Sequence, residues 1–134
     1  MKNKKRIDTY KTQYDIDLVV ANKYVTLEDL KEKYVYGNGD ELDDAILDGC
    51  GTTATCKHKE TDASVLLVKY NRNIRRKDID KFLDLIDTAI HEGMHVLLHM
   101  YDQCSVNIHY DNQEPVCYDA GKIVTNILKT LLNR

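Results

Sequence analysis

The sequence predicts a single α+β domain in which a small, mainly antiparallel sheet packs on two or three helices. Three observations lead to this class. Two stretches rich in β-branched and large apolar residues are separated by a short polar segment, which is typical of a β-hairpin. Two later stretches repeat apolar residues every three or four positions, as amphipathic helices do. The length of 134 residues suits one domain that buries a sizeable core without disulfides.

The first third of the chain is predicted to hold a strand, a helix and a loop. Residues 14–22 alternate in polarity and then run apolar, which indicates a strand with one buried face. Thr26 is a favourable residue to cap a helix, and Gly37 is expected to end that helix. Residues 37–51 are rich in glycine and aspartate, and we expect a loop with one short helical turn.

The rest of the chain is predicted to form the hairpin and two helices. The hairpin arms are residues 51–58 and 63–71. A long helix is expected over residues 79–101 and a second over 115–132. Periodicity places Gly121 on or next to the inward face of the second helix, so its missing side chain is expected to let the two helices approach closely. The apolar stripe of the first helix, expected to face the core, consists of Ile79, Phe82, Leu83, Ile86, Ile90, Met94, Leu97 and Tyr101.

Composition limits the classes of function and location. The 19 basic and 22 acidic residues give a formal charge of −3, so no overall field attracts nucleic acid or an anionic membrane. The basic run at 72–77 lacks the interleaved aromatic residues of a nucleic-acid-binding surface. Asp8 and Lys11 interrupt the place where a signal peptide has its apolar region, so residues 1–12 are predicted to be a flexible basic tail. With no apolar stretch long enough to span a bilayer, we expect a cytoplasmic protein with four free cysteine thiols.

The strongest functional signal is the sequence HEGMH at residues 91–95. His91 and His95 are four residues apart on the long helix, so they project from one face and can bind a single ion. Glu92 points to the other side of this pair, where it suits a carboxylate that takes a proton from zinc-bound water. The sequence therefore predicts a zinc site with His91 and His95 as ligands and Glu92 as general base. Asp87, one turn before His91, is a candidate for orienting a ring of the pair.

A catalytic zinc site needs a third protein ligand, and the sequence offers several candidates. His99 is excluded because three histidines at four-residue intervals spread along about 12 Å of helix axis. Glu114, at the start of the last helix, is the leading candidate, with His109 and Asp111 as alternatives. Tyr118, one turn after Glu114, is a candidate for stabilising the negative oxygen that forms during hydrolysis.

The two motifs together resemble a known family. HEGMH followed by Glu114 resembles the gluzincins, whose fold pairs an HExxH helix with a second helix that donates a glutamate. More closely, HEGMHVLLHMYD followed by YDNQEPVCYDAGKIV is similar to a group of small phage proteins described as metallopeptidases. The likeness covers residues 45–132. It implies that His91, His95 and Glu114 are the zinc ligands and that Glu92 is the general base. It also implies that the strand at 65–70 borders the cleft, where a peptide substrate can add a strand.

We therefore expect a zinc-dependent hydrolase of the metallopeptidase type, which cleaves a peptide or other amide bond with a zinc-activated water. The expected partner is a peptide or protein substrate, in the cytoplasm of the host cell if a phage encodes the chain. The alternative is a zinc-binding protein without enzymatic activity that acts through a protein partner. In that case His109 or Asp111 would complete a closed set of four protein ligands.

Overall fold

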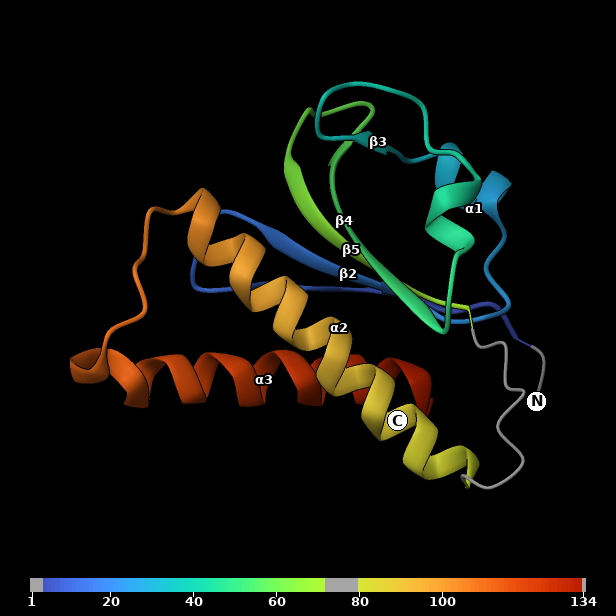
Figure 1. The fold of residues 1–134 in the computed structure, drawn as a ribbon. Helices are drawn as coiled ribbons and strands as arrows, with labels where there is room; N and C mark the ends of the chain where they lie inside the picture. The colour runs from blue at the N-terminus through green and yellow to red at the C-terminus, as the bar shows by residue number, and fades with distance from the viewer. Residues whose placement is uncertain (1–3, 72–79, 134) are drawn as a thin grey trace.

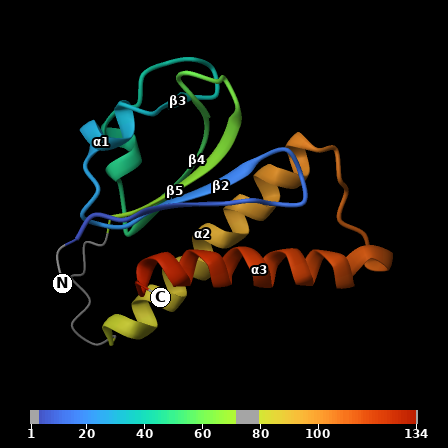
Figure 2. The ribbon, with the colours of Figure 1, turned by 180° about the vertical axis from the view of Figure 1, so that it is seen from behind.

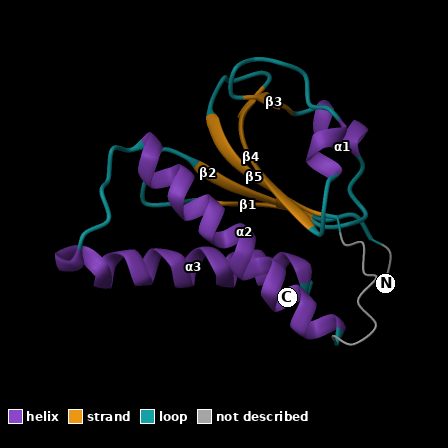
Figure 3. Ribbon diagram, in the orientation of Figure 1, coloured by secondary structure: helices purple, strands orange, loops and turns teal. Residues whose placement is uncertain are grey.

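A five-stranded sheet forms the centre of the fold. The structure is a computed structural model, which describes residues 4–71 and 80–133. The strand order is β1-β2-β5-β4-β3, with β2 and β5 parallel and the other three pairs antiparallel. The strands are β1 (Ile7–Tyr10), β2 (Asp17–Ala21), β3 (Tyr34–Tyr36), β4 (Gly51–His58) and β5 (Ser64–Tyr70). The architecture is the predicted α+β class with a mainly antiparallel sheet (Figure 3).

Helices cover both faces of this sheet. They are α1 (Leu27–Lys31), a 3₁₀ helix (Asp44–Leu47), α2 (Lys81–Gln103) and α3 (Gln113–Leu131). α2 and α3 pack on one face, and α1 and the 3₁₀ helix pack on the other (Figures 1 and 2). The central strands β2 and β5 are consequently buried on both faces, not on the one face that was predicted for 14–22. Among the described residues, none of the helices has the length and apolar character needed to cross a membrane.

The predicted start of α1 and both hairpin arms are confirmed. The Thr26 hydroxyl accepts from the Asp29 N–H at 3.1 Å, and the Asp29 carboxylate accepts from the Thr26 N–H at 2.8 Å. This reciprocal pair satisfies backbone donors that the first turn leaves free. The helix ends at Lys31, well before Gly37, because residues 34–36 pair with β4 as β3. Two tyrosines flanking a valine favour a strand there.

The N-terminal segment differs from the prediction. Residues 7–10, expected to belong to a flexible tail, form β1, which pairs with β2 along its whole length. The Tyr10 hydroxyl also lies 2.7 Å from the Thr130 hydroxyl of α3, so this edge strand is tied to the last helix. The basic run at 72–77 and the expected first residue of the long helix, Ile79, lie outside the described residues.

α2 and α3 approach closely at Gly93, inside the HEGMH sequence. A Cβ atom placed on Gly93 would lie 2.8 Å from the Val124 side chain, closer than two carbon atoms can pack. Gly121, which was predicted for this role, is exposed, and a Cβ atom placed there would meet no atom within 4 Å. The prediction for Gly121 is therefore wrong, and the motif helix itself supplies the glycine at the contact.

The buried face of α2 is also shifted from the predicted stripe. Leu97 and Tyr101 are buried as expected, but four members of the stripe are 42% to 57% exposed: Phe82, Leu83, Ile90 and Met94. The residues that face the sheet and α3 instead include two very small ones, Ala89 and Gly93. Small side chains are required where backbones pack closely, so the large apolar residues flank the contact and do not form it.

Candidate metal centre

The two histidines of HEGMH lie on the side of α2 that faces away from α3. His91 and His95 are each two residues from Gly93, which is about 200° of helical rotation, so both point away from the α3 contact. Their Nε2 atoms are 3.2 Å apart. Two zinc–nitrogen bonds of about 2.0–2.1 Å at a tetrahedral angle would separate the nitrogens by about 3.3 Å. The observed pair therefore fits two ligand positions of one zinc ion.

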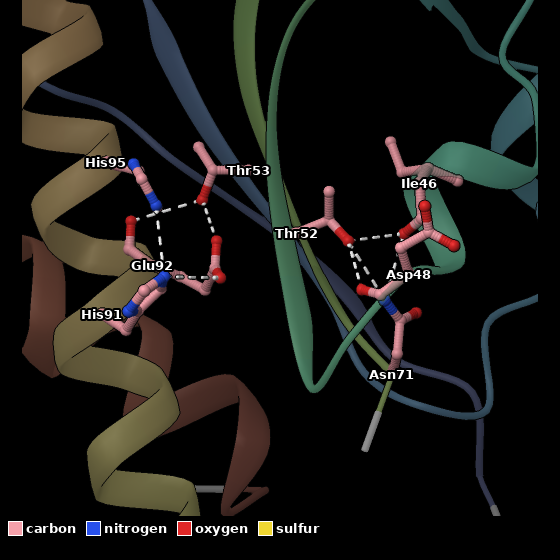
Figure 4. A network of polar contacts seen from close by, with 8 residues as sticks. All are labelled: Ile46, Asp48, Thr52, Thr53, Asn71, His91, Glu92 and His95. Carbon is pink, nitrogen blue, oxygen red and sulfur yellow. Dashed lines mark hydrogen bonds and ion pairs between the residues drawn. The ribbon is translucent and has the colours of Figure 1, made fainter. Parts of the chain in front are cut away.

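Glu92 lies beside this pair, between α2 and β4. Its side chain is buried, and the Thr53 hydroxyl of β4 donates a 2.5 Å hydrogen bond to carboxylate atom Oε2. The other oxygen, Oε1, lies 4.0 Å from His91 Nε2. Figure 4 shows the side chains of Glu92 and the two histidines turned toward Thr53 across the space between helix and strand. The carboxylate is thus held next to the histidine nitrogens by a residue of the sheet.

Two hollows adjoin this group of side chains. One is a cleft of about 250 Å³ between β4 and α2, lined by Gly51, Thr52, Thr53, His91, Glu92, His95 and His99. The other has about 320 Å³ and adds Cys50, Asp84, Asp87 and Thr88 to the lining around His91 and Glu92. His99 borders the first hollow, but its ring centre is 6.5 Å from that of His95, compared with 4.9 Å between His91 and His95. The larger distance between the His95 and His99 rings agrees with the prediction that His99 does not bind the same ion as His91 and His95.

The strand that borders the cleft is β4, not the predicted strand at 65–70. That segment is β5, which pairs on both sides with β2 and β4 and has no edge to offer to a peptide. In β4, even-numbered residues direct their backbone N–H and C=O groups toward β5, since the Cys50 carbonyl accepts from the Asn71 N–H. Odd-numbered residues face the other way, because the Thr55 carbonyl accepts from the Gly37 N–H.

Part of this outer edge of β4 is open. β3 pairs with β4 only over Cys56–His58, so within the described residues Gly51 and Thr53 have no strand opposite their outward N–H and C=O groups. These same two residues line the cleft with the histidine pair. An exposed backbone edge and two candidate zinc ligands thus border one hollow.

The remaining predicted site residues lie at the start of α3, away from the histidine pair (Figures 1 and 2). α3 contacts Gly93 at Val124, ten residues after Glu114, which corresponds to about 15 Å of helix. Tyr118 is 75% exposed. In the described part of the chain, no three His, Cys, Asp or Glu side chains are grouped so that they could hold a metal ion. The structure therefore brings together two of the predicted ligands and the predicted base, but it does not bring Glu114 or Tyr118 to them.

His109 and Asp111, the alternative ligands, belong to the connection between the helices. His109 is exposed, and its N–H donates to the Asn112 side chain at 2.7 Å to begin the 3₁₀ turn Tyr110–Asn112. Asp111 is exposed within this turn. Both residues precede Glu114 in the chain, so the orientation of α3 that removes Glu114 from the cleft removes them as well.

Asp119, in the first half of α3, connects this helix to α2 and to the N-terminal segment. Its carboxylate accepts a 2.5 Å hydrogen bond from the buried Tyr101 hydroxyl of α2 and two more from the Gln13 side chain. Burial and this hydrogen bond raise the pKa of Tyr101 above the usual 10.0. The contact fixes the end of α2 to α3 at a point far along the helix from the histidine pair.

Asp87, the predicted orienting residue, is exposed and lines the second hollow together with His91. Among the described residues no hydrogen bond joins it to His91, so its role stays a prediction. Asp84, one turn earlier, is buried and lines the same hollow. The four cysteines are free thiols, as predicted, and burial raises the pKa of Cys56 to about 12.

Sequence reasoning missed Gly51 and Thr53, the residues of β4 that contact Glu92. Small residues at alternating positions of the hairpin arm indicate one face on which another element packs closely. That signal identifies the face but not the neighbour, because the helix that covers it lies some 40 residues later in the chain.

Comparison of the chain with protein-family models, with curated proteins and with solved structures finds no match. The resemblance to the gluzincins therefore rests on HEGMH and Glu114, of which HEGMH alone borders the cleft.

Proposed function

We propose that the protein is a zinc-dependent hydrolase of peptide or amide bonds, with His91 and His95 as metal ligands and Glu92 as general base. One observation carries the proposal: the histidine pair, the glutamate and the open edge of β4 line the same cleft. The 3.2 Å separation of the two Nε2 atoms supports binding of a single ion. A zinc ion at such a site supplies a bound water with a pKa near 7 and polarises a carbonyl group.

The side chains of the cleft would have separate roles in metal binding and proton transfer. The two imidazoles would hold the ion through their Nε2 atoms. Glu92 presents Oε1 on the side of His91, while Oε2 is occupied by Thr53, so one oxygen stays available to accept a proton. Burial of this carboxylate limits competing water around it. A catalytic zinc site has three protein ligands, and the described residues of the cleft supply two, so the position of the third, like those of water and substrate, would be left open on the ion.

The open edge of β4 favours an extended peptide as the substrate. Gly51 and Thr53 direct N–H and C=O groups outward beside the histidine pair, so a peptide can form ladder hydrogen bonds with them. Such pairing would align the peptide along the cleft and bring a carbonyl group past the ligand nitrogens. Backbone pairing recognises the extended chain and not a particular side chain.

A second candidate function is a zinc protein that acts through a protein partner without hydrolysis. The observation that favours it is a row of exposed apolar residues on α2, Ile90, Met94 and Leu98, which follow one another at four-residue intervals beside the histidine pair. Apolar residues gathered on one helix face are typical of protein contact sites.

Metal analysis and a cleavage screen test the proposal. We expect the purified protein to hold one zinc per chain and to cleave members of a quenched-fluorescent peptide library. Glu92→Gln should retain the zinc and lower cleavage by at least about 100-fold, because the amide cannot accept the proton. If the wild-type protein holds no stoichiometric zinc after supplementation, the proposal is wrong. Stoichiometric zinc without cleavage of any peptide would favour the second candidate.

A further inference from the structure

We infer that Thr53, with Gly51 beside it, positions the carboxylate of Glu92 in the cleft. The inference rests on the proposed function for its catalytic meaning, but the contact itself can be tested in the metal-free protein. Thr53 comes from β4 and Glu92 from α2, 39 residues later, so the contact forms only when the helix docks on the sheet. It joins the strand side of the cleft to the helix side.

The hydroxyl of Thr53 has two acceptors within reach and one proton to donate. Glu92 Oε2 lies at 2.5 Å, and the Glu92 backbone carbonyl lies at 3.3 Å. The backbone carbonyl already has a partner inside α2, namely the N–H four residues later. Oε2 is also the nearer of the two acceptors by 0.8 Å. The proton therefore goes to the carboxylate.

Gly51 controls the other end of the same side chain. A Cβ atom placed on Gly51 would lie 3.1 Å from Glu92 Cγ and 3.0 Å from the Thr88 methyl group. The absence of a side chain at this position lets the glutamate lie flat against the strand. Glycine at position 51 thus leaves the space that Cγ occupies, Thr53 binds Oε2, and Oε1 lies on the side of His91.

Thr53 also presents its backbone groups to the open edge of β4, where the proposed peptide would pair. A side-chain substitution removes the hydrogen bond to Glu92 but leaves those backbone groups in place. Loss of the hydroxyl should therefore lower kcat and spare KM, because the peptide still binds while the base is no longer fixed. A displacement of a reacting group by about 1 Å can cost about 100-fold in rate.

The test compares Thr53→Val with Thr53→Ser. Valine matches threonine in shape and favours strands, so the fold should be retained, whereas serine keeps the hydroxyl. Thr55→Val is the matched control, since Thr55 lies on the same face of β4 and its hydroxyl makes no hydrogen bond to another described residue. Circular dichroism and thermal unfolding establish that each variant folds.

Two readouts decide the result. In metal-free protein labelled with ¹³C-glutamate, the side-chain carboxyl resonance of Glu92, assigned with Glu92→Gln, should move in Thr53→Val and stay in place in Thr53→Ser and Thr55→Val. In the zinc-loaded protein, Thr53→Val should lower kcat for a cleaved library peptide by about 10-fold to 100-fold with KM and zinc affinity unchanged. A Glu92 resonance that ignores Thr53→Val, or a kcat equal to that of the wild type, overturns the inference. Absence of zinc from the wild type would instead overturn the proposed function, and the resonance would still decide whether Thr53 holds Glu92.

Discussion

α2 has β4 on one side and α3 on the other, and the two contacts differ in kind. The contact with β4 is polar and incomplete, with a hydrogen bond from Thr53 to Glu92 and an open cleft beside it. The contact with α3 is closed and mainly apolar around Gly93, where the side chain of Val124 packs on the glycine, and it has one hydrogen bond, from Tyr101 to Asp119, near the end of α2. The five-residue sequence HEGMH therefore contains both a candidate metal centre and a close helix–helix contact.

This difference shows which ligands a helical motif can predict and which ones depend on the packing of another helix. His91 and His95 are neighbours because one backbone spaces them, so their geometry is local. A third ligand from α3 depends on where that helix crosses α2, and the crossing is set by packing at Gly93. In the structure this packing directs the start of α3, with Glu114, away from the cleft.

Among substitutions on the two sides of α2, the largest expected effect is the loss of zinc affinity in a variant of the histidine pair. His95→Ala removes one of the two nitrogen ligands and should weaken zinc binding by at least about 100-fold, more than the loss of an outer hydrogen-bond partner. Glu114→Ala should leave zinc affinity unchanged, because Glu114 lies at the far end of α3. Competition with a chromogenic chelator measures both. An equal loss in the two variants would mean that the start of α3 reaches the histidine pair, as the sequence had predicted.

The α3 side of the comparison is tested by Tyr101→Phe, which removes the hydroxyl that donates to Asp119. A hydrogen bond to a charged group contributes about 1.5–3 kcal/mol, and we expect a loss of this size in the free energy of unfolding. Zinc affinity should not change, because the contact is remote from the histidines. The exposed Tyr118, one residue before Asp119, gives the control: Tyr118→Phe should alter stability by less than about 0.5 kcal/mol.

The stabilisation by Tyr101 should also depend on pH. The folded protein raises the pKa of Tyr101 above the ordinary 10.0, so above that pH the unfolded chain loses a proton that the folded chain keeps. The contribution is therefore fully present below about pH 10 and decreases as the pH rises further. Urea unfolding of wild type and Tyr101→Phe at pH values on either side of 10 measures it. A difference between the two proteins that grows with rising pH would contradict this assignment.

The features predicted correctly from the sequence are those set by neighbours along the chain. Thr26 and Asp29 satisfy each other's backbone donors within one turn, and the hairpin arms are joined by a short connection. The spacing of His91 and His95 is of the same kind. Each of these depends on a few consecutive residues, so periodicity and capping rules suffice to predict them.

The features that were missed depend on pairing between distant segments. The family resemblance implied that the strand at 65–70 borders the cleft, but β5 lies at the centre of the sheet because β2 pairs with its other edge. Residues 7–10 belong to a polar segment that was predicted to be a flexible tail, but they pair with β2 and form an edge strand of the sheet. The hydrogen bond from Thr53 to Glu92 depends on how α2 packs against β4, which no local sequence pattern encodes.

The smallest expected effect compares two glycines, one on each helix of the α2–α3 pair. Gly93→Ala places a methyl group 2.8 Å from Val124, and this overpacking should destabilise the protein by about 1–3 kcal/mol even though alanine favours helices. Gly121→Ala meets no atom within 4 Å and should stabilise the protein by up to about 1 kcal/mol through helix propensity.

Equilibrium unfolding in urea resolves the opposite signs of the two changes. Val124→Ala in the Gly93→Ala background should restore part of the lost stability, because it removes the atom that the new methyl group meets. If Gly121→Ala is the destabilising variant and Gly93→Ala the neutral one, α3 contacts α2 through its own glycine. The helix would then be rotated and shifted so that the predicted approach at Gly121 is the true one, and Glu114 would return as the expected third ligand.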